Sequence, residues 1–188
     1  MTMAIKQILR MGHPVLNRVA EIVRDPRDPE IAALVEDMKD SLAAVGGTGL
    51  AAPQIGVSLR VVIFAAPAHR LTGLPEDTEQ ELMAIVNPVI EPLSDRKSLG
   101  WEGCLSIPGM RGEVPRHTRI RYHGLALDGS RIDRTVEGFH ARIVQHEFDH
   151  LDGILYPARM IDLMRLGFTD EMVAAGTLTP FPQAAKVS

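Results

Sequence analysis

Two stretches of the chain carry apolar residues at the three- and four-residue spacing of an amphipathic helix. The first is predicted over residues 29–45, because Asp28 suits the N-cap and Pro29 the first helical position. Gly46 and Gly47 follow and end this helix. Charged residues occupy its other face, so we expect it to pack on the core as scaffold without chemistry of its own.

The second stretch begins after Gly138 and is predicted to end at Gly153. Its apolar residues flank two histidines, which predicts a helix buried at the centre of the molecule with sheets packed around it. These apolar residues are Phe139, Ile143, Val144, Phe148 and Leu151.

Shorter apolar or alternating runs predict β-strands between and around these helices. They cover residues 60–65, 83–90, 119–125 and 131–136. Asp128-Gly129 joins the last two runs as a hairpin signal, and Asn87-Pro88 predicts a kink or an edge position in the second. Strands that follow one another in hairpins favour antiparallel pairing over βαβ units. We therefore expect an α+β fold with antiparallel sheets packed around the central helix.

The length of 188 residues suits one domain, 1–188, with one sizeable core. Residues 1–27 mix a short apolar run with turn residues and are expected to form an N-terminal arm packed on the body. Pro157 is expected to open a further helix that runs through Leu166, and the tail from Gly176 is expected to fray. This C-terminal helix and tail make up residues 157–188.

Composition narrows the class of protein. Hydrophobic residues make up 45% and charged residues 23% of the chain, as in an ordinary globular protein. The net charge is −4 and no basic cluster occurs, which argues against direct binding of nucleic acid. No apolar run reaches the length of a membrane span, and the N-terminus lacks the pattern of a secretory signal. Cys104 is the only cysteine and cannot form an internal disulfide, so we expect a reducing, cytoplasmic setting without membrane association.

Candidate chemistry enters with His146-Glu147-x-x-His150 on the second predicted helix. Residues four apart lie above one another on one helical face, so both imidazoles can converge on a single cation. Glu147 lies about 100° around the helix from His146, within reach of a water at the metal without being a ligand. The pattern predicts a metallohydrolase, against the plainer interpretation of two surface histidines on an ordinary amphipathic helix.

A catalytic metal site of this kind needs a third protein ligand, and the sequence leaves three options open. An extended His-Glu-x-x-His-x-x-Gly-x-x-His pattern would end at Tyr156, which is not a histidine, and no histidine follows His150. Glu171 lies downstream, at a tolerable distance for a zinc peptidase of the thermolysin type. Cys104 offers a thiolate, a strong ligand for iron, zinc or nickel, although a free cysteine is most often a buried apolar residue.

The residues around the cysteine favour a functional interpretation. Glu102-Gly103-Cys104-Leu105-Ser106 places the thiol between a glycine and polar groups, as in a turn that presents a side chain. A hydrolase with a Cys-His pair is an alternative, but it would leave the spacing of the two histidines around Glu147 unexplained.

Residues 46–56 form a glycine-rich segment between the first helix and the strand at 60–65. The segment contains the loose dinucleotide pattern G-x-G-x-x-A, but that pattern must follow a strand and open a helix, and here the order is reversed. No Gly-Lys-Ser/Thr follows, which excludes a phosphate loop. The segment is therefore either a tight turn or a place where another backbone, such as a peptide substrate, approaches closely.

Three segments together resemble the signature motifs of the peptide deformylase family of the bacterial type, in the same order and at similar separations. They are Gly47-Thr48-Gly49-Leu50-Ala51-Ala52-Pro53-Gln54-Ile55-Gly56, then Glu102-Gly103-Cys104-Leu105-Ser106, then Gln145-His146-Glu147-Phe148-Asp149-His150-Leu151. The resemblance runs over roughly residues 5–160, and three motifs are far more specific than one. It implies a metal-dependent hydrolase that removes the formyl group from the initiator methionine of newly made proteins and releases formate.

The resemblance also implies a metal site. Cys104, His146 and His150 would bind one divalent ion, natively Fe(II), for which Zn(II), Ni(II) or Co(II) can substitute. Glu147 would act as the general base that activates water and then as the acid that protonates the departing amine.

Other implied roles concern the substrate. The side-chain amide of Gln54 and the backbone N–H of Leu105 would stabilise the tetrahedral oxyanion. Gly49 would offer its backbone to a peptide bound in a strand-like pose. Arg111 matches a family arginine near the substrate backbone, although a solvated loop arginine is the plainer interpretation.

The methionine side chain of the substrate requires an apolar pocket, for which Phe139, Ile143 and the wall of the motif helix are the natural candidates. Trp101 either shapes the rim of this pocket or only packs beside it. Glu102 is expected to orient the site rather than react, because Glu147 already fills the role of base. Asp149 either hydrogen-bonds behind the metal ligands or is an exposed helix acid.

The expected partners are N-formyl-methionyl nascent peptides, with transient association with the ribosome, and neither nucleic acid nor membrane is expected as a direct partner. The segment after Tyr156 departs from a strongly basic docking helix, because Arg159 and Arg165 are offset by acidic residues. These acids are Asp162, Asp170 and Glu171. The sequence therefore puts ribosome contact through this segment in doubt.

Overall fold

The structure of the chain, a computed structural model, describes residues 5–178. Its helices are α1 (Pro29–Val45), α2 (Gly138–Leu151) and α3 (Thr169–Ala174). Its strands are β1 (Gly49–Ala51), β2 (Val61–Ala66), β3 (Gln80–Pro92), β4 (Lys97–Cys104), β5 (Ile107–His117), β6 (Arg119–Leu125), β7 (Arg131–Glu137) and β8 (Leu166–Phe168). Single 3-10 turns lie at Pro14–Asn17, Ala52–Ile55, Ala68–Arg70, Tyr156–Arg159 and Leu163–Arg165.

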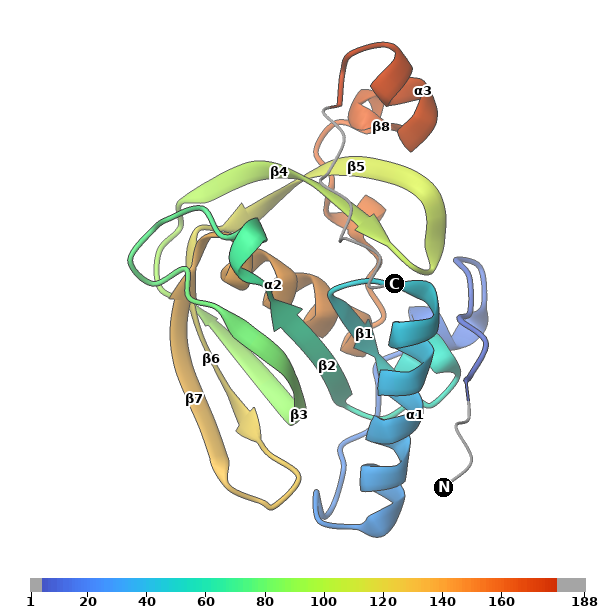
Figure 1. The fold of residues 1–188 in the computed structure, drawn as a ribbon, viewed down its shortest axis with the longest axis vertical. Coiled ribbons are helices and arrows are strands. Elements are labelled where there is room, and N and C mark those ends of the chain that lie inside the picture. Colours follow the sequence, from blue (N-terminus) through green and yellow to red (C-terminus); the bar gives the residue numbers. More distant parts are fainter. Residues whose placement is uncertain (1–4, 179–188) are drawn as a thin grey trace.

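Two antiparallel sheets enclose α2. The larger sheet has the strand order β1-β2-β3-β6-β7 and the smaller has the order β4-β5-β8. Figure 1 shows α2 between the larger sheet and the β4–β5 hairpin, while α1 covers β1 and β2 from the other side. The predicted α+β fold, with antiparallel sheets around a central helix, is confirmed by this arrangement.

Three apolar clusters fill the spaces between these layers. One joins α2 to the inner face of the larger sheet through residues such as Phe64, Tyr122 and Phe148. A second joins α1 to β1 and β2, with Val35 and Met38 completely buried. The third lies under the smaller sheet and contains Cys104 itself. The cysteine is therefore buried where the smaller sheet meets the segment that follows α2.

The predicted boundaries of α1 are confirmed. The carboxylate of Asp28 accepts a hydrogen bond of 2.9 Å from the N–H of Glu30, as an N-cap does, and Gly46 ends the helix with φ +75°. The kink predicted at Asn87-Pro88 also occurs, because Asn87 has φ +50° and the pairing of β3 with β6 shifts register there. The strand is central rather than at an edge, since β3 pairs with β2 and β6.

Strands β1, β4, β5 and β8 lie outside the predicted strands. Glycine and proline weaken a strand pattern, and β4 contains Gly100 and Gly103 while β5 contains Pro108, Gly109 and Pro115. Pairing across the β4–β5 hairpin, rather than local propensity, holds these residues extended. The two glycines of β4 lie against arginine side chains, which accounts for their presence in a strand.

The start of α2 is fixed by a residue that lies far away in the sequence. The carboxylate of Asp77 accepts hydrogen bonds from the backbone N–H groups of Phe139 and His140, at 3.1 and 2.9 Å. Burial alone would raise the pKa of Asp77, but the hydrogen bonds from His140 and Thr72 outweigh it and hold the pKa below its usual value. The loop before β3 thereby anchors the motif helix.

The N-terminal arm is packed on the body, as predicted. Val15 and Leu16 are buried, and the N–H of Ala20 donates to the carbonyl of Leu151 at the end of α2. Nearer the N-terminus, the N–H groups of Leu9 and Met11 donate to the carbonyls of Gln54 and Ser106, respectively, at 2.8 Å each. The arm therefore supports from behind two segments that carry candidate site residues.

The helix predicted from Pro157 through Leu166 is wrong. Two 3-10 turns and the strand β8 occupy this segment, and Leu163 and Met164 are exposed. The side chain of Asp162 accepts from the N–H of Met164, a local hydrogen bond that competes with helix formation, and β8 pairs with β5. Most of the tail expected to fray, residues 179–188, lies outside the described residues, whereas Leu178 is buried.

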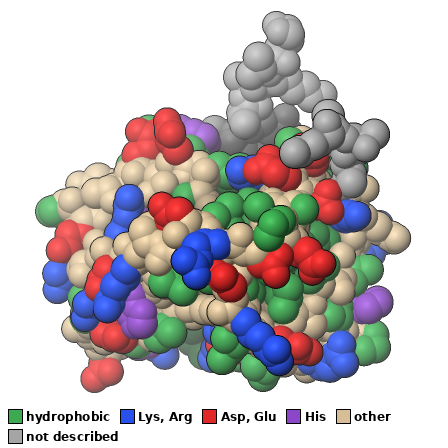
Figure 2. Space-filling view, turned by 90° about the horizontal axis from the view of Figure 1, so that it is seen from below, with side chains coloured by type: hydrophobic (Ala, Val, Ile, Leu, Met, Phe, Trp, Pro, Cys, Tyr) green, Lys and Arg blue, Asp and Glu red, His purple; other side chains and the backbone are tan. Residues whose placement is uncertain are grey.

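The surface carries charges of both signs. On the face in Figure 2, acidic and basic side chains are interspersed with apolar ones and form no stripe of one sign. Across residues 5–178, none of the helices has the length and apolar character needed to cross a bilayer.

Candidate active site

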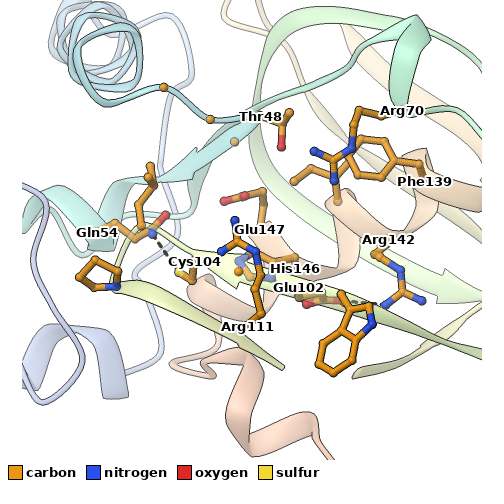
Figure 3. A pocket seen from close by; sticks show the side chains of 18 of the residues that line it. Thr48, Gln54, Arg70, Glu102, Cys104, Arg111, Phe139, Arg142, His146 and Glu147 are labelled. Atoms are coloured by element: carbon orange, nitrogen blue, oxygen red, sulfur yellow. Dashed lines mark hydrogen bonds and ion pairs between the residues drawn. The ribbon is translucent and has the colours of Figure 1, made fainter. Parts of the chain in front are cut away.

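A cavity of about 420 Å³ opens between β1, β4 and α2. It is lined by Cys104, His146 and Glu147, by the glycine-rich loop, and by Trp101, Arg111 and Phe139. Figure 3 shows the side chains of Cys104, Arg111, Phe139, His146 and Glu147 converging from different elements. The cavity therefore gathers all three sequence motifs in one place.

Cys104, His146 and His150 form a compact ligand set. One potential ligand atom from each lies within 4.8 Å of the other two, and all three residues are buried. The two histidines come from successive turns of α2, whereas the cysteine comes from the end of β4, just before the turn to β5. The sulfur lies 3.4 Å from Nε2 of His150, so the strand end and the helix meet at this point.

The charges of this set suit a metal ion. Burial alone would raise the pKa of the Cys104 thiol, but the charge of His150 and the hydrogen bonds from both histidines hold it well below its usual value. The thiolate is the form that binds metals. Three soft or borderline donors of two kinds, one thiolate and two imidazoles, suit Fe, Zn, Ni or Co rather than Mg or Ca.

A buried polar atom beside the ligand set also indicates a group that binds here. Oε2 of Glu147 is buried and has no hydrogen-bond partner among the described residues. Buried polar atoms are almost always paired, so an unpaired carboxylate oxygen beside three ligand atoms fits an ion and water as the occupants of the site. The residues present therefore fit one divalent metal ion.

Glu147 lies against the edge strand β1. A Cβ atom on Gly49 would overlap Oε1 of Glu147, so only glycine permits this contact. Burial raises the pKa of Glu147 to about 7, despite the opposing charges of His146 and His150. Glycine is therefore required at position 49 for more than the formation of a turn. It leaves room for the carboxylate of Glu147, which the sequence predicts as the general base.

Gln54 is held in one orientation. Its Oε1 accepts from the N–H of Ala51 at 2.8 Å, which turns the amide nitrogen toward the cavity. That nitrogen donates to the hydroxyl of Ser106 at 3.1 Å and lies 3.5 Å from the sulfur of Cys104. Leu105, between the cysteine and the serine, also lines the cavity. Both predicted oxyanion donors therefore border the ligand set.

A buried carboxylate lies behind the first histidine. Nδ1 of His146 donates to Glu102 at 2.8 Å, which leaves the other ring nitrogen for the cavity. Arg116 donates to both carboxylate oxygens of Glu102 at 2.9 Å, and Arg142 donates to one of them at 2.9 Å. Burial alone would raise the pKa of Glu102, but His146 and Arg116 hold it far below its usual value. Glu102 therefore stays ionised and fixes the ring of His146, which accords with the orienting role that the sequence predicts.

Asp149 extends this network and is not an exposed helix acid. It accepts a hydrogen bond of 2.5 Å from Arg116 and two from Arg159, at 3.1 and 2.7 Å. Arg116 thereby bridges two carboxylates, Glu102 on β4 and Asp149 on α2. The smaller sheet, α2 and the segment after α2 are joined by one chain of ion pairs.

The other predicted substrate residues also line the cavity. Phe139 and Ile143 form an apolar wall on α2, and Arg111 lies against β4, where a Cβ atom on Gly103 would overlap its guanidinium. Trp101 lines the rim and also packs outward, since the guanidinium of Arg165 lies 4.8 Å from its ring centroid. Both interpretations of Trp101 therefore hold at once.

The alternative third ligands do not join the set. Tyr156 is buried and stacks on the ring of His146, with ring centroids 6.3 Å apart, and burial raises the pKa of its hydroxyl to about 12. Glu171 lies exposed in the short helix α3. Within residues 5–178 the ligand set comprises Cys104 and the two histidines and does not include Glu171.

The sequence predicted Arg111, but it did not indicate three other arginines, Arg70, Arg116 and Arg142, that lie in or behind the site. Arg142 lies four residues before His146 and shares its carboxylate, so helical spacing could have indicated it. Arg116 shares the buried face of β5 with Val114. Because this strand was not predicted, the sequence did not indicate that Arg116 is buried. Arg70 belongs to a surface loop in sequence and gave no signal.

Comparisons with known proteins agree with this geometry. A sequence model of the family described as "Polypeptide deformylase" matches residues 5–165. The chain is 52% identical over 174 residues to "Peptide deformylase 1" of Nitrosomonas europaea, which covers 93% of this chain and 98% of that protein. It is 55% identical over 166 residues to "Peptide deformylase 2" of Ralstonia nicotianae, covering 88% and 93% of the two chains.

Solved structures give the same result. A peptide deformylase from Ehrlichia chaffeensis in complex with actinonin has a TM-score of 0.78 at 30% identity, covering 93% of this chain and 97% of that one. A class I type b peptide deformylase from Acinetobacter baumannii with bound Met-Ala-Ser has a TM-score of 0.75 at 34% identity, covering 85% and 100% of the two chains.

The ligand set leads to a prediction about metal content. Cys104→Ser should lose most of the bound Zn(II) or Ni(II), because a hydroxyl does not ionise to replace the thiolate, whereas Glu171→Ala should keep about one ion per chain. Plasma mass spectrometry after loading and gel filtration measures the ratio. A full complement of metal in Cys104→Ser would contradict the assigned ligand set.

The ion-pair chain leads to a second prediction, on stability. Arg116→Ala leaves Glu102 and Asp149 with fewer partners in a buried setting, so the free energy of unfolding should fall by about 3–5 kcal/mol. The matched control is Arg121→Ala, which breaks exposed ion pairs with Asp133 and Glu91 and should lower the free energy of unfolding far less, because solvent screens exposed pairs. Urea unfolding of the metal-free proteins compares the two. Equal losses would show that Arg116 does not hold the network together.

Proposed function

The chain belongs to the polypeptide deformylase family, and from this premise we propose how its residues perform the reaction. The protein is a metal-dependent hydrolase that removes the N-formyl group from newly made proteins. One observation supports the roles proposed below. Cys104, His146 and His150 converge around one point, and Glu147 lies beside them with its Oε2 unpaired among the described residues.

The metal in this proposal is a single Fe(II) ion held by Cys104, His146 and His150, and Zn(II), Ni(II) or Co(II) can take its place. A divalent ion in this position supplies Lewis-acid chemistry, which polarises the formyl carbonyl and makes water more acidic. The donor set of one thiolate and two imidazoles supports such an ion. Three ligands from the protein also leave room for water or substrate.

Glu147 is the proposed general base and acid. Its carboxylate takes the proton of the attacking water as the new C–O bond forms, and it then passes the proton to the amine as the C–N bond of the formyl group breaks. Formate and a free N-terminal methionine are the products. Burial and the contact with Gly49 keep the carboxylate in one place and out of bulk water.

Gln54 and Leu105 are the proposed donors to the oxyanion of the tetrahedral intermediate. The support for Gln54 is its orientation, since the bond from Ala51 fixes the amide so that its N–H groups face the ligand set. Donors that are fixed in advance cost no reorganisation during the reaction, and the loss of one such donor typically lowers kcat by about 10²–10³.

The substrate is proposed to bind as a strand beside β1. This strand pairs with β2 on one side only and forms the edge of the larger sheet, so Gly49 can offer its backbone to a peptide. The peptide Met-Ala-Ser is bound in the A. baumannii deformylase. In the present chain, Phe139 and Ile143 supply the apolar wall for a methionine side chain, and Arg111 lies near the path of the peptide backbone.

Glu102 is proposed as a positioning residue rather than a reacting one. Its bond to Nδ1 of His146 fixes the ring and makes the other nitrogen a better ligand. The ion pairs with Arg116 and Arg142 keep the carboxylate charged in its buried place.

We further propose that the protein works in the cytoplasm. Two observations support this location. The proposed reaction acts on newly made chains, and the single cysteine, Cys104, is buried as a free thiol, as is usual in a reducing compartment. Ribosome association through the C-terminal segment has little support, because Arg159 pairs with Asp149 and Arg165 pairs with Glu113 within the molecule.

The test of the proposed function is formate release. Protein loaded with Fe(II) or Ni(II) without oxygen should release formate from formyl-Met-Ala-Ser and leave its peptide bonds intact. Glu147→Gln should keep its metal but lose about 10²–10⁴-fold in turnover, because the water loses its base. The matched control, Glu36→Gln, removes an exposed carboxylate that pairs with Lys39 and should leave turnover unchanged.

Two outcomes would overturn the proposal. Metal-loaded protein that releases no formate would remove the assigned reaction, and cleavage of an internal peptide bond would favour a peptidase. Full turnover by Glu147→Gln would remove the role of this carboxylate alone.

A further inference from the structure

A second cavity, of about 390 Å³, lies against another face of α2. It shares no lining residue with the active-site cavity. Helix α2 contributes Ile143 and His146 to the first cavity and Gln145, Phe148 and Asp149 to the second. Successive residues advance about 100° around a helix, so these two sets point to different sides. The helix therefore separates two cavities that can be occupied independently.

Much of the second cavity is lined by apolar side chains. They are those of Pro88, Val89, Ile90, Pro92, Pro115 and Phe148. The part from β3 is shaped by the bend at Asn87, where the register with β6 shifts. Asn87 fixes this bend, because its side chain accepts from the N–H of Val23 at 2.9 Å and donates to the carbonyl of Val23 at 2.8 Å. A register shift of this kind redirects the side chains of a strand, and here it places them along a cavity.

The rim of the cavity includes the open end of the β4–β5 hairpin. Lys97 and His117 are partners across this hairpin and both line the cavity. Residues directly opposite each other in an antiparallel pair have Cβ atoms about 5 Å apart, so the two side chains lie beside each other. Gln145 holds this end of β5, because its amide accepts from the N–H of His117 at 3.0 Å and donates to its carbonyl at 2.9 Å. The rim is therefore fixed before any ligand binds.

The charges of the lining leave one cation over. The charged residues are Arg60, Lys97, Arg116, Asp149, Asp152 and Arg159. Each arginine has a carboxylate partner: Asp152 for Arg60, Asp149 for Arg159, and both Glu102 and Asp149 for Arg116. Lys97, in contrast, forms no ion pair within residues 5–178. The cavity thus combines apolar walls with an unbalanced ammonium group at its rim.

We propose that this second cavity binds a small organic anion. Its apolar body, preferably an aromatic ring, lies against the prolines and Phe148, and its carboxylate or phosphate group lies beside Lys97 and His117. A concave, mostly apolar lining with a few fixed polar groups is what small-molecule sites share, and an anionic group gains a charge-assisted hydrogen bond from the ammonium. The inference goes beyond the proposed function and does not depend on it, because none of the lining residues is a metal ligand, the general base or a substrate contact.

The test uses two probes with the same ring system, 2-naphthoate and 2-naphthyl phosphate, and the neutral 2-naphthamide as their matched control. Each is titrated into the Zn(II)-loaded protein while amide chemical shifts are followed by NMR. The better anion should bind with a Kd of about 1 mM, as its size allows, and the amide at least about threefold more weakly. The shifts should centre on Val89, Ile90 and His117, and the advantage of the anion should shrink as salt is raised.

Variants at the rim identify the source of the preference. Lys97→Gln should weaken the anion about threefold and leave the amide unchanged, and Lys97→Glu should weaken the anion about tenfold. Val89→Glu places a carboxylate at an exposed position of the apolar wall and should also repel the anion. The matched control is Lys39→Gln, because Lys39 is an exposed lysine paired with Glu36 on α1, and it should keep the full affinity.

Three outcomes would overturn the inference. One is equal affinity for the anions and the amide, or no saturable shift with either anion. Another is a set of shifts confined to Gly47, Gly49 and Leu105, which would place the probe in the active-site cavity instead. The third is unchanged affinity for the anion in both Lys97→Glu and Val89→Glu. None of these results would alter the release of formate, so the proposed function is tested separately.

Discussion

The carboxylate of Glu102 ties the smaller sheet to the central helix, and the geometry of the active site depends on it. From the buried face of β4 it accepts hydrogen bonds from Arg116 on β5 and from Arg142 and His146 on α2. A buried ion pair is a weak source of stability, because desolvation of the charges offsets most of their attraction. Here the ion pairs fix positions. They hold the helix that carries His146 and the strand that ends in Cys104 in one relative position, so that a thiolate and two imidazoles face one another. Asp149 extends the same constraint through Arg116 to the segment after α2.

A site built in this way separates structural charge from reacting charge. The carboxylate of Glu102, behind His146, is saturated with hydrogen-bond donors and stays ionised. Glu147 follows His146 in the sequence, but it lies on another side of the helix, against the backbone of Gly49. Burial raises the pKa of Glu147 to about 7, and its Oε2 has no partner among the described residues. Two neighbouring side chains on α2 thus have opposite surroundings: His146 is held by a buried carboxylate, whereas Glu147 keeps one carboxylate oxygen without a partner among the described residues.

Much of this could be predicted from the sequence because its signals are local. The helical spacing of apolar residues and the capping residues predict the bounds of α1. The spacing of His146 and His150 predicts that both imidazoles can bind one ion. What the sequence could not supply depends on contacts between distant segments. The hairpin of β4 and β5 forms from residues with poor strand propensity, so Arg116 could not be assigned to a buried face. The helix expected from Pro157 failed because Asp162 and the pairing of β8 override an apolar pattern. Likewise, Arg70 reaches the cavity only through the fold of a loop.

The proposed metal site depends on the sulfur of Cys104, which completes the ligand set begun by the two histidines of α2. X-ray absorption at the metal edge of the Zn(II)-loaded protein measures this directly, because sulfur and nitrogen scatter differently. With Cys104 as a ligand, one sulfur should lie at about 2.3 Å and two imidazole nitrogens at about 2.0–2.1 Å from the zinc. A shell of nitrogen and oxygen alone, without sulfur, would contradict it.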